Sequence, residues 1–216
     1  MNRQLFSHID TWVFDLDHTL YPPQMALFDQ IERKMTTYVM RELTVSQQEA
    51  DQLRQNYWAT YGTTLAGLMT HHAVDPIPYL EEVHDISFHP LQEDPDLRAA
   101  LEGLPGQKIV YTNGTQPYAE KVLQARGLEG VFDAVFGIEH AEFEPKPRRR
   151  AFERVFRTAK LNPRKSAMFE DVPRNLIVPH ALGMRTVHVA PQPETADHIH
   201  HHTNHLSTFL DTLREA

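Results

Sequence analysis

A short apolar run, Trp12 to Phe14, ends in two carboxylates, Asp15 and Asp17. The run has the length and composition of a buried strand. Carboxylates at the end of a buried strand need a cationic partner, a metal ion or a ligand, because burying an unpaired charge is costly. If Leu16 turns the chain, both carboxylates face the crevice beyond the carboxyl end of the strand, where open α/β sheets bind ligands. The alternative is a strand with an ordinary acidic turn, since short motifs also occur by chance.

The composition is that of a globular protein. Of the 216 residues, 41% are hydrophobic and 23% are charged, and this length fits either one domain with a large insertion or two small domains. The net charge of −8 argues against nucleic acid as a partner and against an anionic membrane. The absence of cysteine excludes disulfides, thiolate metal ligands and a cysteine nucleophile.

No apolar run approaches the ~18 residues of a membrane span. The N-terminal stretch, Met1 to Asp10, is polar and lacks the apolar core of a signal peptide. We therefore expect a cytoplasmic protein without a membrane partner, present as a monomer or a homodimer.

Residues 21–88 have the hydrophobic pattern of helices. Apolar residues recur there at steps of three and four, and Ser46 and Glu49 have the spacing of a capping box. Tyr21, Pro22 and Pro23 separate this block from the first strand, since prolines interrupt regular structure. We expect no strand in the block and interpret it as an all-helical cap domain.

The rest of the chain alternates between strand and helix patterns. We expect strands at 108–111, within 131–136, at 167–169 and at 186–189, and helices at 94–104, 117–126, 147–161, 177–182 and 206–213. Such alternation predicts an α/β fold, a Rossmann-like and mostly parallel sheet with helices on both faces. The core domain would comprise residues 1–20 and 89–216, and the cap domain residues 21–88.

Further polar segments follow the predicted strands or lie near them. They are Thr112-Asn113-Gly114, Lys146 in a Glu-Pro-Lys-Pro segment, and Glu170-Asp171. Because the carboxyl ends of parallel strands share one edge of a sheet, these segments and the first two carboxylates would meet in one crevice.

The chemistry of these segments is complementary. Four carboxylates in one crevice repel one another unless a hard divalent cation binds there, and Mg²⁺ is usual where phosphate also binds. The Thr112 hydroxyl, the backbone amides at Asn113 and Gly114, and the Lys146 ammonium are donors suited to a phosphoryl group. A carboxylate beside a bound phosphate can attack it, and a second one can protonate the leaving oxygen and then activate water.

In order and spacing, four segments resemble the motifs of the haloacid dehalogenase-like hydrolase superfamily. They are Asp15-Leu16-Asp17-His18-Thr19, Thr112-Asn113-Gly114, Lys146-Pro147 and Glu170-Asp171-x-x-x-Asn175. The resemblance covers nearly the whole chain, including a helical cap inserted after the first motif. It implies a Mg²⁺-dependent phosphatase acting on a small phosphorylated metabolite, a nucleotide or a sugar phosphate.

The resemblance also implies roles for individual residues. Asp15 would be the nucleophile and Asp17 the general acid and base, while Thr112 and Lys146 would bind the phosphoryl group. Mg²⁺ would be bound by Asp15, the backbone carbonyl of Asp17 and Asp171, with Glu170 in support. Two other residues complete the comparison: Asn175 would orient the fourth loop, and His18, where many members carry Gly or Asn, would point away from the phosphate.

Residues 61–68, Tyr-Gly-Thr-Thr-Leu-Ala-Gly-Leu, are similar to the pyrimidine 5′-nucleotidase branch of the superfamily, as are Val83-His84-Asp85 and Leu104-Pro105-Gly106. This similarity implies a cap loop whose Thr63 and Thr64 reach toward the substrate; an ordinary turn between helices is the alternative. Trp58, Tyr57 and Tyr61 could stack on a nucleobase; helical spacing favours Tyr57 as a core residue, and Tyr61, next to Gly62, is the better candidate for contact. We expect His84 to link the cap to the core.

Other functions use the same motifs. A sugar-phosphate phosphatase and a phosphomutase are alternatives, as is a non-catalytic binding domain that keeps the scaffold. A haloacid dehalogenase shares the aspartate nucleophile but needs neither Mg²⁺ nor the second carboxylate of the first motif, so Asp17, Glu170 and Asp171 argue against it.

Two charged clusters lie outside the motifs. His198, His202 and His205 would share one face at helical spacing and could bind a metal, whereas a mobile polar segment is the alternative. The run from Arg148 to Arg150 is interpreted as the solvated face of a helix.

Overall fold

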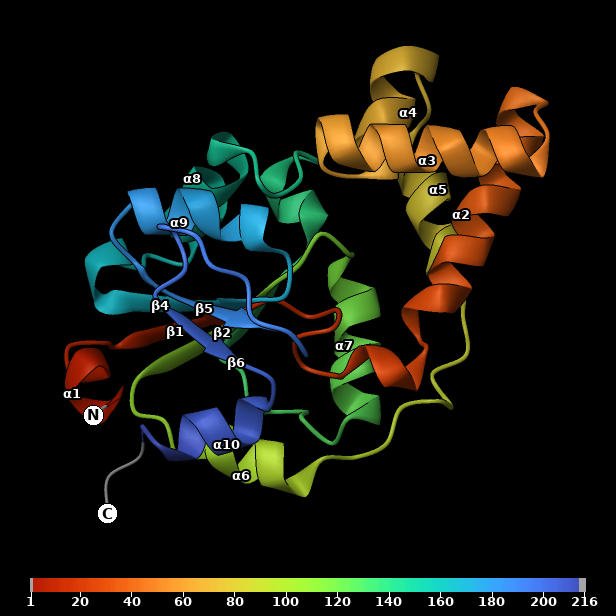
Figure 1. Ribbon diagram of the computed structural model, residues 1–216. Helices are drawn as coiled ribbons and strands as arrows, with labels where there is room; N and C mark the ends of the chain where they lie inside the picture. The colour runs from red at the N-terminus through yellow and green to blue at the C-terminus, as the bar shows by residue number, and fades with distance from the viewer. Residues whose placement is uncertain (1, 214–216) are drawn as a thin grey trace.

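The central strand of the sheet is β1 (Thr11–Phe14), and all four of its residues are buried. The computed structural model describes residues 2–213, and within that range six strands form one sheet in the order β3-β2-β1-β4-β5-β6 (Figure 1). Every pairing between neighbouring strands is parallel. The other strands are β2 (Gln107–Tyr111), β3 (Ala134–Phe136), β4 (Ser166–Glu170), β5 (Arg185–Val189) and β6 (His201–Thr203). The predicted α/β fold is confirmed.

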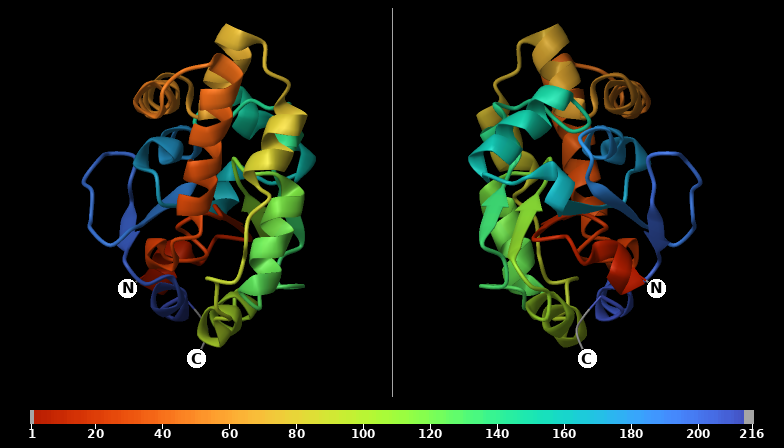
Figure 2. Two further views of the ribbon diagram at one scale, coloured as in Figure 1. Left: turned by 90° about the vertical axis from the view of Figure 1, so that its right-hand side faces the viewer. Right: turned by 90° about the vertical axis from the view of Figure 1, so that its left-hand side faces the viewer.

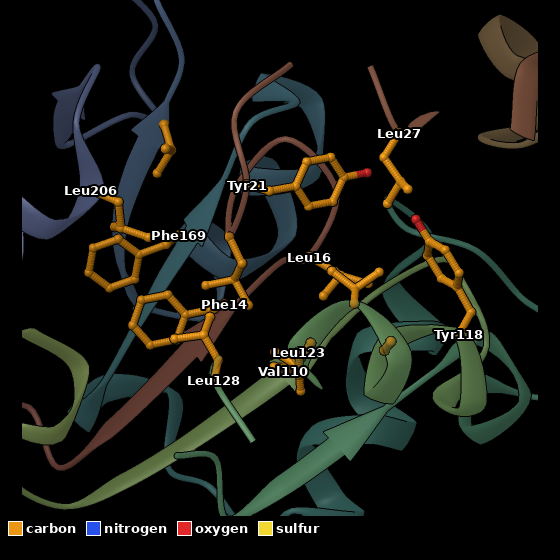
Figure 3. Close-up of a cluster of buried hydrophobic side chains, with 14 of the residues drawn as sticks. Phe14, Leu16, Tyr21, Leu27, Val110, Tyr118, Leu123, Leu128, Phe169 and Leu206 are labelled. Atoms are coloured by element: carbon orange, nitrogen blue, oxygen red, sulfur yellow. The ribbon is translucent and has the colours of Figure 1, made fainter. Parts of the chain in front are cut away.

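Alternate residues of the central strands pack on opposite faces of the sheet, as the pleat requires. Trp12 and Phe14 belong to one hydrophobic cluster, and Val13 between them belongs to another. Figure 3 shows the first cluster, in which Phe14 stacks on Phe169 of β4 with ring centroids 4.6 Å apart. Because both faces are buried at β1 and β4, these two strands contain apolar runs rather than alternating patterns.

Helices cover both faces of the sheet (Figure 1). Residues of α1 (Asn2–Phe6), α6 (Pro95–Glu102), α7 (Gln116–Ala125) and α10 (Leu206–Asp211) contribute to the first cluster. Residues of α8 (Arg149–Thr158) contribute to the second, and α9 (Ile177–Ala181) packs beside them. In α8 the buried side chains are Ala151, Phe152, Val155 and Phe156, at the spacing of one helix face. Within residues 2–213, no helix has the length and apolar character that a membrane crossing requires.

Four helices form a separate group beyond one end of the sheet: α2 (Phe28–Leu43), α3 (Gln47–Tyr61), α4 (Thr64–His72) and α5 (Pro76–Val83). Figures 1 and 2 show them projecting from the α/β layers next to α7. All of residues 21–88 are described, and no strand occurs among them, as predicted. The Ser46 hydroxyl and the Glu49 carboxylate form the capping box that begins α3.

Two elements differ from the sequence predictions. The histidine-rich segment contains β6 rather than a helix, so the helical spacing of His198, His202 and His205 was the wrong model for it. His202 instead contacts the Ala190 carbonyl at 2.8 Å. The short helix α1 was not predicted, because the polar segment that forms it has no clear periodicity.

A buried arginine, Arg126 at the end of α7, holds the backbone at Leu20, just after the first motif. The Arg126 side chain is 2% exposed, and its guanidinium donates to the carbonyls of Leu20 and Gln92 and pairs with Asp94 at 2.6 Å. Arginine is seldom buried without such partners. Arg126 therefore ties the turn after β1 to the start of α6.

Replacing Arg126 with methionine keeps much of the side-chain volume but removes every one of these contacts. We expect the free energy of unfolding to fall by about 2–4 kcal/mol, because the Leu20 and Gln92 carbonyls and the Asp94 carboxylate lose their donor. Urea denaturation measures this change. The control, Arg157→Met on the exposed face of α8, should stay within about 0.5 kcal/mol of the wild type; equal losses in both variants would contradict the role given to Arg126.

Candidate active site

The strand ends bring the sequence-predicted carboxylates together. Phe14 pairs with Phe169, and the Asp15 N–H donates to the Phe169 carbonyl at 2.9 Å, so Asp15 lies beside the end of β4. Glu170 is the last residue of β4, one residue later than predicted, and Asp171 follows it. Within residues 2–213, ligand oxygens of Asp15, Glu170 and Asp171 lie within 4.8 Å of one another. The sheet thus gathers three carboxylates from two neighbouring strands.

Lys146 is the cationic partner of this cluster. Its side chain is 1% exposed, and Nζ lies 2.5 Å from Asp15 Oδ1 and 2.7 Å from Glu170 Oε2. Nζ also donates to the Tyr111 carbonyl at the end of β2, at 3.0 Å. These three contacts use the three hydrogens of the ammonium group. Lys146 therefore joins the ends of β1, β2 and β4.

Asn113 holds the Lys146 backbone in place. Its Oδ1 accepts from the Lys146 N–H at 2.8 Å, and its Nδ2 donates to the Lys146 carbonyl at 3.4 Å. The Thr112 side chain is buried beside it and accepts from the Gly114 N–H at 2.9 Å. The segment that was predicted to bind phosphate thus also positions the lysine.

The carboxylate cluster carries more negative charge than Lys146 can neutralise. Burial, and then repulsion from Glu170, raise the pKa of Asp15 to about 7 although Lys146 lowers it. Burial likewise raises the pKa of Glu170 to about 7 and raises that of Asp171. A buried excess of carboxylate oxygens is the donor set that a hard divalent cation prefers. The residues present therefore fit a Mg²⁺ ion.

Asp17 is held by two tyrosines that the sequence analysis did not single out. The hydroxyls of Tyr21 and Tyr118 each donate to Asp17 Oδ1 at 2.6 Å. Figure 3 shows the two rings in the buried cluster, with their hydroxyls facing the same region. Burial raises the pKa of Asp17, and the two hydrogen bonds oppose the rise by stabilising the carboxylate. Neither tyrosine belongs to a recognisable motif, since in the sequence each resembles an ordinary buried aromatic residue.

His18 lies beside the carboxylate cluster. Its Nδ1 lies 3.6 Å from Asp171 Oδ2, and its ring packs edge-on against Tyr21 and Phe28. Burial disfavours its charged form, but the Asp171 carboxylate raises the His18 pKa above its usual value. His18 has φ of 61°, in the left-handed region that favours Gly and Asn.

A cavity of about 990 Å³ lies between the sheet edge and the helical group. The four carboxylates of the site and the residues predicted to bind phosphate line it, as do Thr63 and Thr64. Thr63 caps α4 by accepting from the Ala66 N–H at 3.2 Å, and Thr64 is buried at its first turn. The structure thus brings the predicted site residues and the predicted cap loop around one cavity.

Gly62 fits closely between two segments of the site. Its φ is +97°, and a Cβ there would lie 2.7 Å from the Lys146 carbonyl oxygen. Arg174, from the turn after β4, donates to the Gly62 carbonyl at 3.3 Å. Glycine is required here both by conformation and by the closeness of the Lys146 backbone, so the glycine in this motif serves packing rather than flexibility.

Of the aromatic residues near the Gly62 turn, Trp58 borders the cavity and Tyr61 does not. The Tyr61 hydroxyl lies 2.6 Å from His71. His84 stacks on Tyr118, with ring centroids 4.4 Å apart, and contacts the Thr115 hydroxyl. It links the helical group to α7, and burial lowers its pKa to about 4. The run from Arg148 to Arg150 is exposed, as predicted.

The chain is similar to known proteins along most of its length. A family model described as haloacid dehalogenase-like hydrolase matches residues 12–189. Phosphate metabolism protein 8 of Saccharomyces cerevisiae is 27% identical over 164 residues, covering 68% of this chain. The match covers 50% of that protein, so the chain spans about half the length of this curated relative.

Solved structures with the same fold include a HAD phosphatase of Thermococcus onnurineus, with a TM-score of 0.65, 18% identity and coverage of 95% of this chain and 98% of that one. The HAD-hydrolase YfnB of Bacillus subtilis, in a form bound to magnesium, has a TM-score of 0.61, 16% identity and coverage of 95% and 98%. Dehalogenases are among the similar structures too. At these identities the likeness shows the fold alone.

The raised carboxylate pKa values predict how pH and Mg²⁺ act on stability. Between about pH 4 and about pH 7 the folded, metal-free chain binds more protons at Asp15 than the unfolded chain does, so its unfolding free energy falls as pH rises. A cation that binds the ionised carboxylates reverses this loss. We therefore expect MgCl₂ to raise the Tm more at about pH 8 than at about pH 5, relative to EDTA. Equal Mg²⁺ effects at both pH values would contradict a site built from these carboxylates.

Proposed function

The chain belongs to the haloacid dehalogenase-like hydrolase family, and on that premise we propose that it is a Mg²⁺-dependent phosphatase. It hydrolyses a small phosphate monoester through an aspartyl phosphate, and pyrimidine nucleoside 5′-monophosphates are the first substrates to test. One observation carries the proposal: the ammonium group of Lys146 lies between Asp15 and Glu170, with Asp171 beside them. A nucleophilic carboxylate, a fixed cation and spare oxygen ligands are together what phosphoryl transfer to a carboxylate needs.

In the first half of the reaction, Asp15 attacks the phosphorus atom. The new bond joins a carboxylate oxygen of Asp15 to phosphorus, and the bond from phosphorus to the leaving oxygen breaks. Lys146 holds Asp15 through Oδ1, and the Lys146 contact is supported by the Glu170 carboxylate. The Thr112 hydroxyl and the backbone amides of the loop after β2 bind the phosphoryl oxygens.

Asp17 moves the protons. It gives a proton to the leaving oxygen, then takes one from the water that attacks the aspartyl phosphate, which releases inorganic phosphate and restores Asp15. Tyr21 and Tyr118 both donate to Oδ1. We therefore assign the proton transfer to Oδ2, and the two tyrosines act by positioning the Asp17 carboxylate.

The cation would be held by Asp15, Asp171 and the backbone carbonyl of Asp17, with Glu170 in support. When bound, Mg²⁺ neutralises charge on the carboxylates and on the transferring phosphoryl group. Asn175 orients this end of the site, because its Nδ2 donates to Glu170 Oε1 at 3.0 Å. The oxygen ligands come from the ends of β1 and β4, which are rigid elements of the sheet.

We also propose that residues 21–88 act as a cap domain over a core of residues 1–20 and 89–216. The cap contributes Thr63 and Thr64 to the cavity and encloses the leaving group. Two contacts support the placement of the cap over the core. Gly62 packs against the segment that carries Lys146, and its carbonyl accepts from Arg174, on the segment that carries Asp171.

Replacing Asp15 with asparagine should abolish turnover, by about 10³-fold or more, because an amide oxygen is a poor nucleophile. Phosphate release from UMP, CMP and ribose 5-phosphate, with Mg²⁺ and with EDTA, measures the effect. Asp96→Asn, an exposed change at the start of α6, is the control. Undiminished release by Asp15→Asn would reject the nucleophile, and a preference for ribose 5-phosphate would retain the chemistry and reject the nucleotidase assignment.

Tyr118→Phe tests the positioning of Asp17. The variant keeps the stack on His84 but loses a hydrogen bond that favours the carboxylate form, so the Asp17 pKa rises. We expect kcat to fall by roughly tenfold and the basic limb of the kcat/KM profile to move to higher pH, because the acid stays protonated further.

The matched control for this variant is Tyr57→Phe, which removes a tyrosine hydroxyl that contacts His72 away from the cavity. It should leave the pH profile in place. A kcat loss in Tyr118→Phe without any shift of the profile would mean that the hydroxyl serves the fold alone.

A further inference from the structure

The cavity is much larger than a phosphoryl group. Its volume of about 990 Å³ lies at the upper end of the roughly 300–1,000 Å³ that pockets for small organic ligands have. The carboxylates and Lys146 occupy the sheet edge, and the remaining walls come mainly from α2, α3 and α5. The helical walls are therefore available to the part of the substrate that leaves.

One face of α3 forms much of this wall. Asp51, Arg54, Gln55 and Trp58 all line the cavity, at helical steps of three and four residues. Arg54 and Trp58 are four residues apart, so they lie one above the other on that face. A single ligand can therefore contact both side chains.

Tyr79 of α5 provides a buried donor without a partner. Its side chain is 2% exposed and lines the cavity, and among the described residues no group bonds to its hydroxyl. The ring itself is fixed edge-on against Tyr38, with centroids 4.8 Å apart. A buried hydroxyl that lacks a partner is costly to the fold, so its presence at a cavity wall points to a ligand that pairs with it.

Arg54 provides a second donor of the same kind. Its terminal nitrogens donate to Thr36 at 2.6 Å and to Glu32 at 3.1 Å, and the first also approaches Asp51. Its Nε–H, by contrast, is buried without a partner among residues 2–213. The guanidinium is thus held by its far end while Nε–H is left for an acceptor.

Trp58 provides a flat apolar surface. Its side chain is half exposed, and the Arg174 guanidinium lies 3.8 Å from its ring centroid. Arg174 is itself anchored, because it donates to the carbonyls of Ala59 and Gly62. The ring is therefore fixed in place before a ligand arrives, with a cation on one side of it.

We propose that Trp58, Arg54 and Tyr79 form the subsite for the leaving group, and that it takes a planar ring bearing carbonyl oxygens. The ring stacks on Trp58, and its carbonyl oxygens accept from Arg54 Nε–H and the Tyr79 hydroxyl. The carboxylates of Glu32 and Asp51 beside Arg54 can accept from ring N–H groups. A carbonyl-bearing nucleobase such as uracil has this chemistry, whereas a sugar has acceptors but no planar face. The assignment rests on the proposed phosphatase function only in making the bound ring part of the leaving group.

Nucleoside binding to the whole chain tests the subsite without catalysis, because uridine carries no phosphate. Calorimetry should detect uridine binding and no comparable ribose binding. Uridine should also quench tryptophan fluorescence, since of the two tryptophans Trp58 is half exposed and Trp12 is buried. Equal binding of uridine and ribose would overturn the proposal.

Three variants test the residues. Tyr79→Phe removes only the hydroxyl, Arg54→Lys keeps a cation for Glu32 and Asp51 but removes Nε–H, and Trp58→Leu removes the ring. Each should weaken uridine binding by roughly three- to tenfold, the effect of losing one hydrogen bond or one stacked ring. Wild-type affinity in all three variants would overturn the proposal.

The matched controls are Tyr38→Phe and Tyr61→Leu, aromatic residues of α2 and α3 that do not line the cavity. Both should bind uridine as the wild type does, and weakening equal to that of Tyr79→Phe would show a general loss of fold. If the protein binds uridine through the three residues and yet releases no phosphate from any ester, that result would reject the phosphatase function while keeping the subsite. Phosphate release without selective uridine binding would reject the subsite while keeping the phosphatase function.

Discussion

The buried ammonium group of Lys146 is the interaction on which the site depends. It lies 2.5 Å from Asp15 and 2.7 Å from Glu170, and both carboxylates come from the ends of adjacent central strands. Like-charged side chains would not remain so close in a buried crevice without it, since an uncompensated buried charge costs about 3–5 kcal/mol. Even so, one lysine leaves the carboxylates in excess. Burial and repulsion from Glu170, which raise the pKa of Asp15, would both be relieved by a bound divalent cation.

The helical group is joined to this cluster by backbone contacts as well as by side chains. Gly62 packs against the Lys146 carbonyl, and Arg174 reaches from the turn after β4 to the Gly62 carbonyl. His84 stacks on Tyr118, whose hydroxyl holds Asp17. The elements that would bind the leaving group are therefore in direct contact with those that would perform the chemistry.

Most of the architecture followed from the sequence because its signals are local. Strands buried on both faces appear as apolar runs, as in Trp12 to Phe14, and the amphipathic helices between them predict a parallel sheet. The site followed for the same reason, since carboxylates placed directly after strands must meet at one edge. The strand β6 in the histidine-rich segment was not predicted, because a short edge strand depends on pairing with β5 rather than on its own pattern. Tyr61, the aromatic residue favoured from the sequence, does not line the cavity whereas Trp58 does, because the sequence pattern does not show which face of a helix borders a cavity.

The sequence by itself determined the class of fold, the carboxylates and the lysine, because each follows from hydrophobic period and from position relative to a strand end. Only the tertiary structure decided which distant side chains complete them. Tyr118 lies 101 residues from the Asp17 that it contacts, and Arg174 lies on a different segment from the Trp58 ring that it covers. Such contacts leave no periodic trace, because they depend on how helices pack on the sheet rather than on neighbours along the chain. For the same reason no sequence pattern marks the Arg54 Nε–H and the Tyr79 hydroxyl, which lack partners among residues 2–213 and belong to side chains that line the cavity.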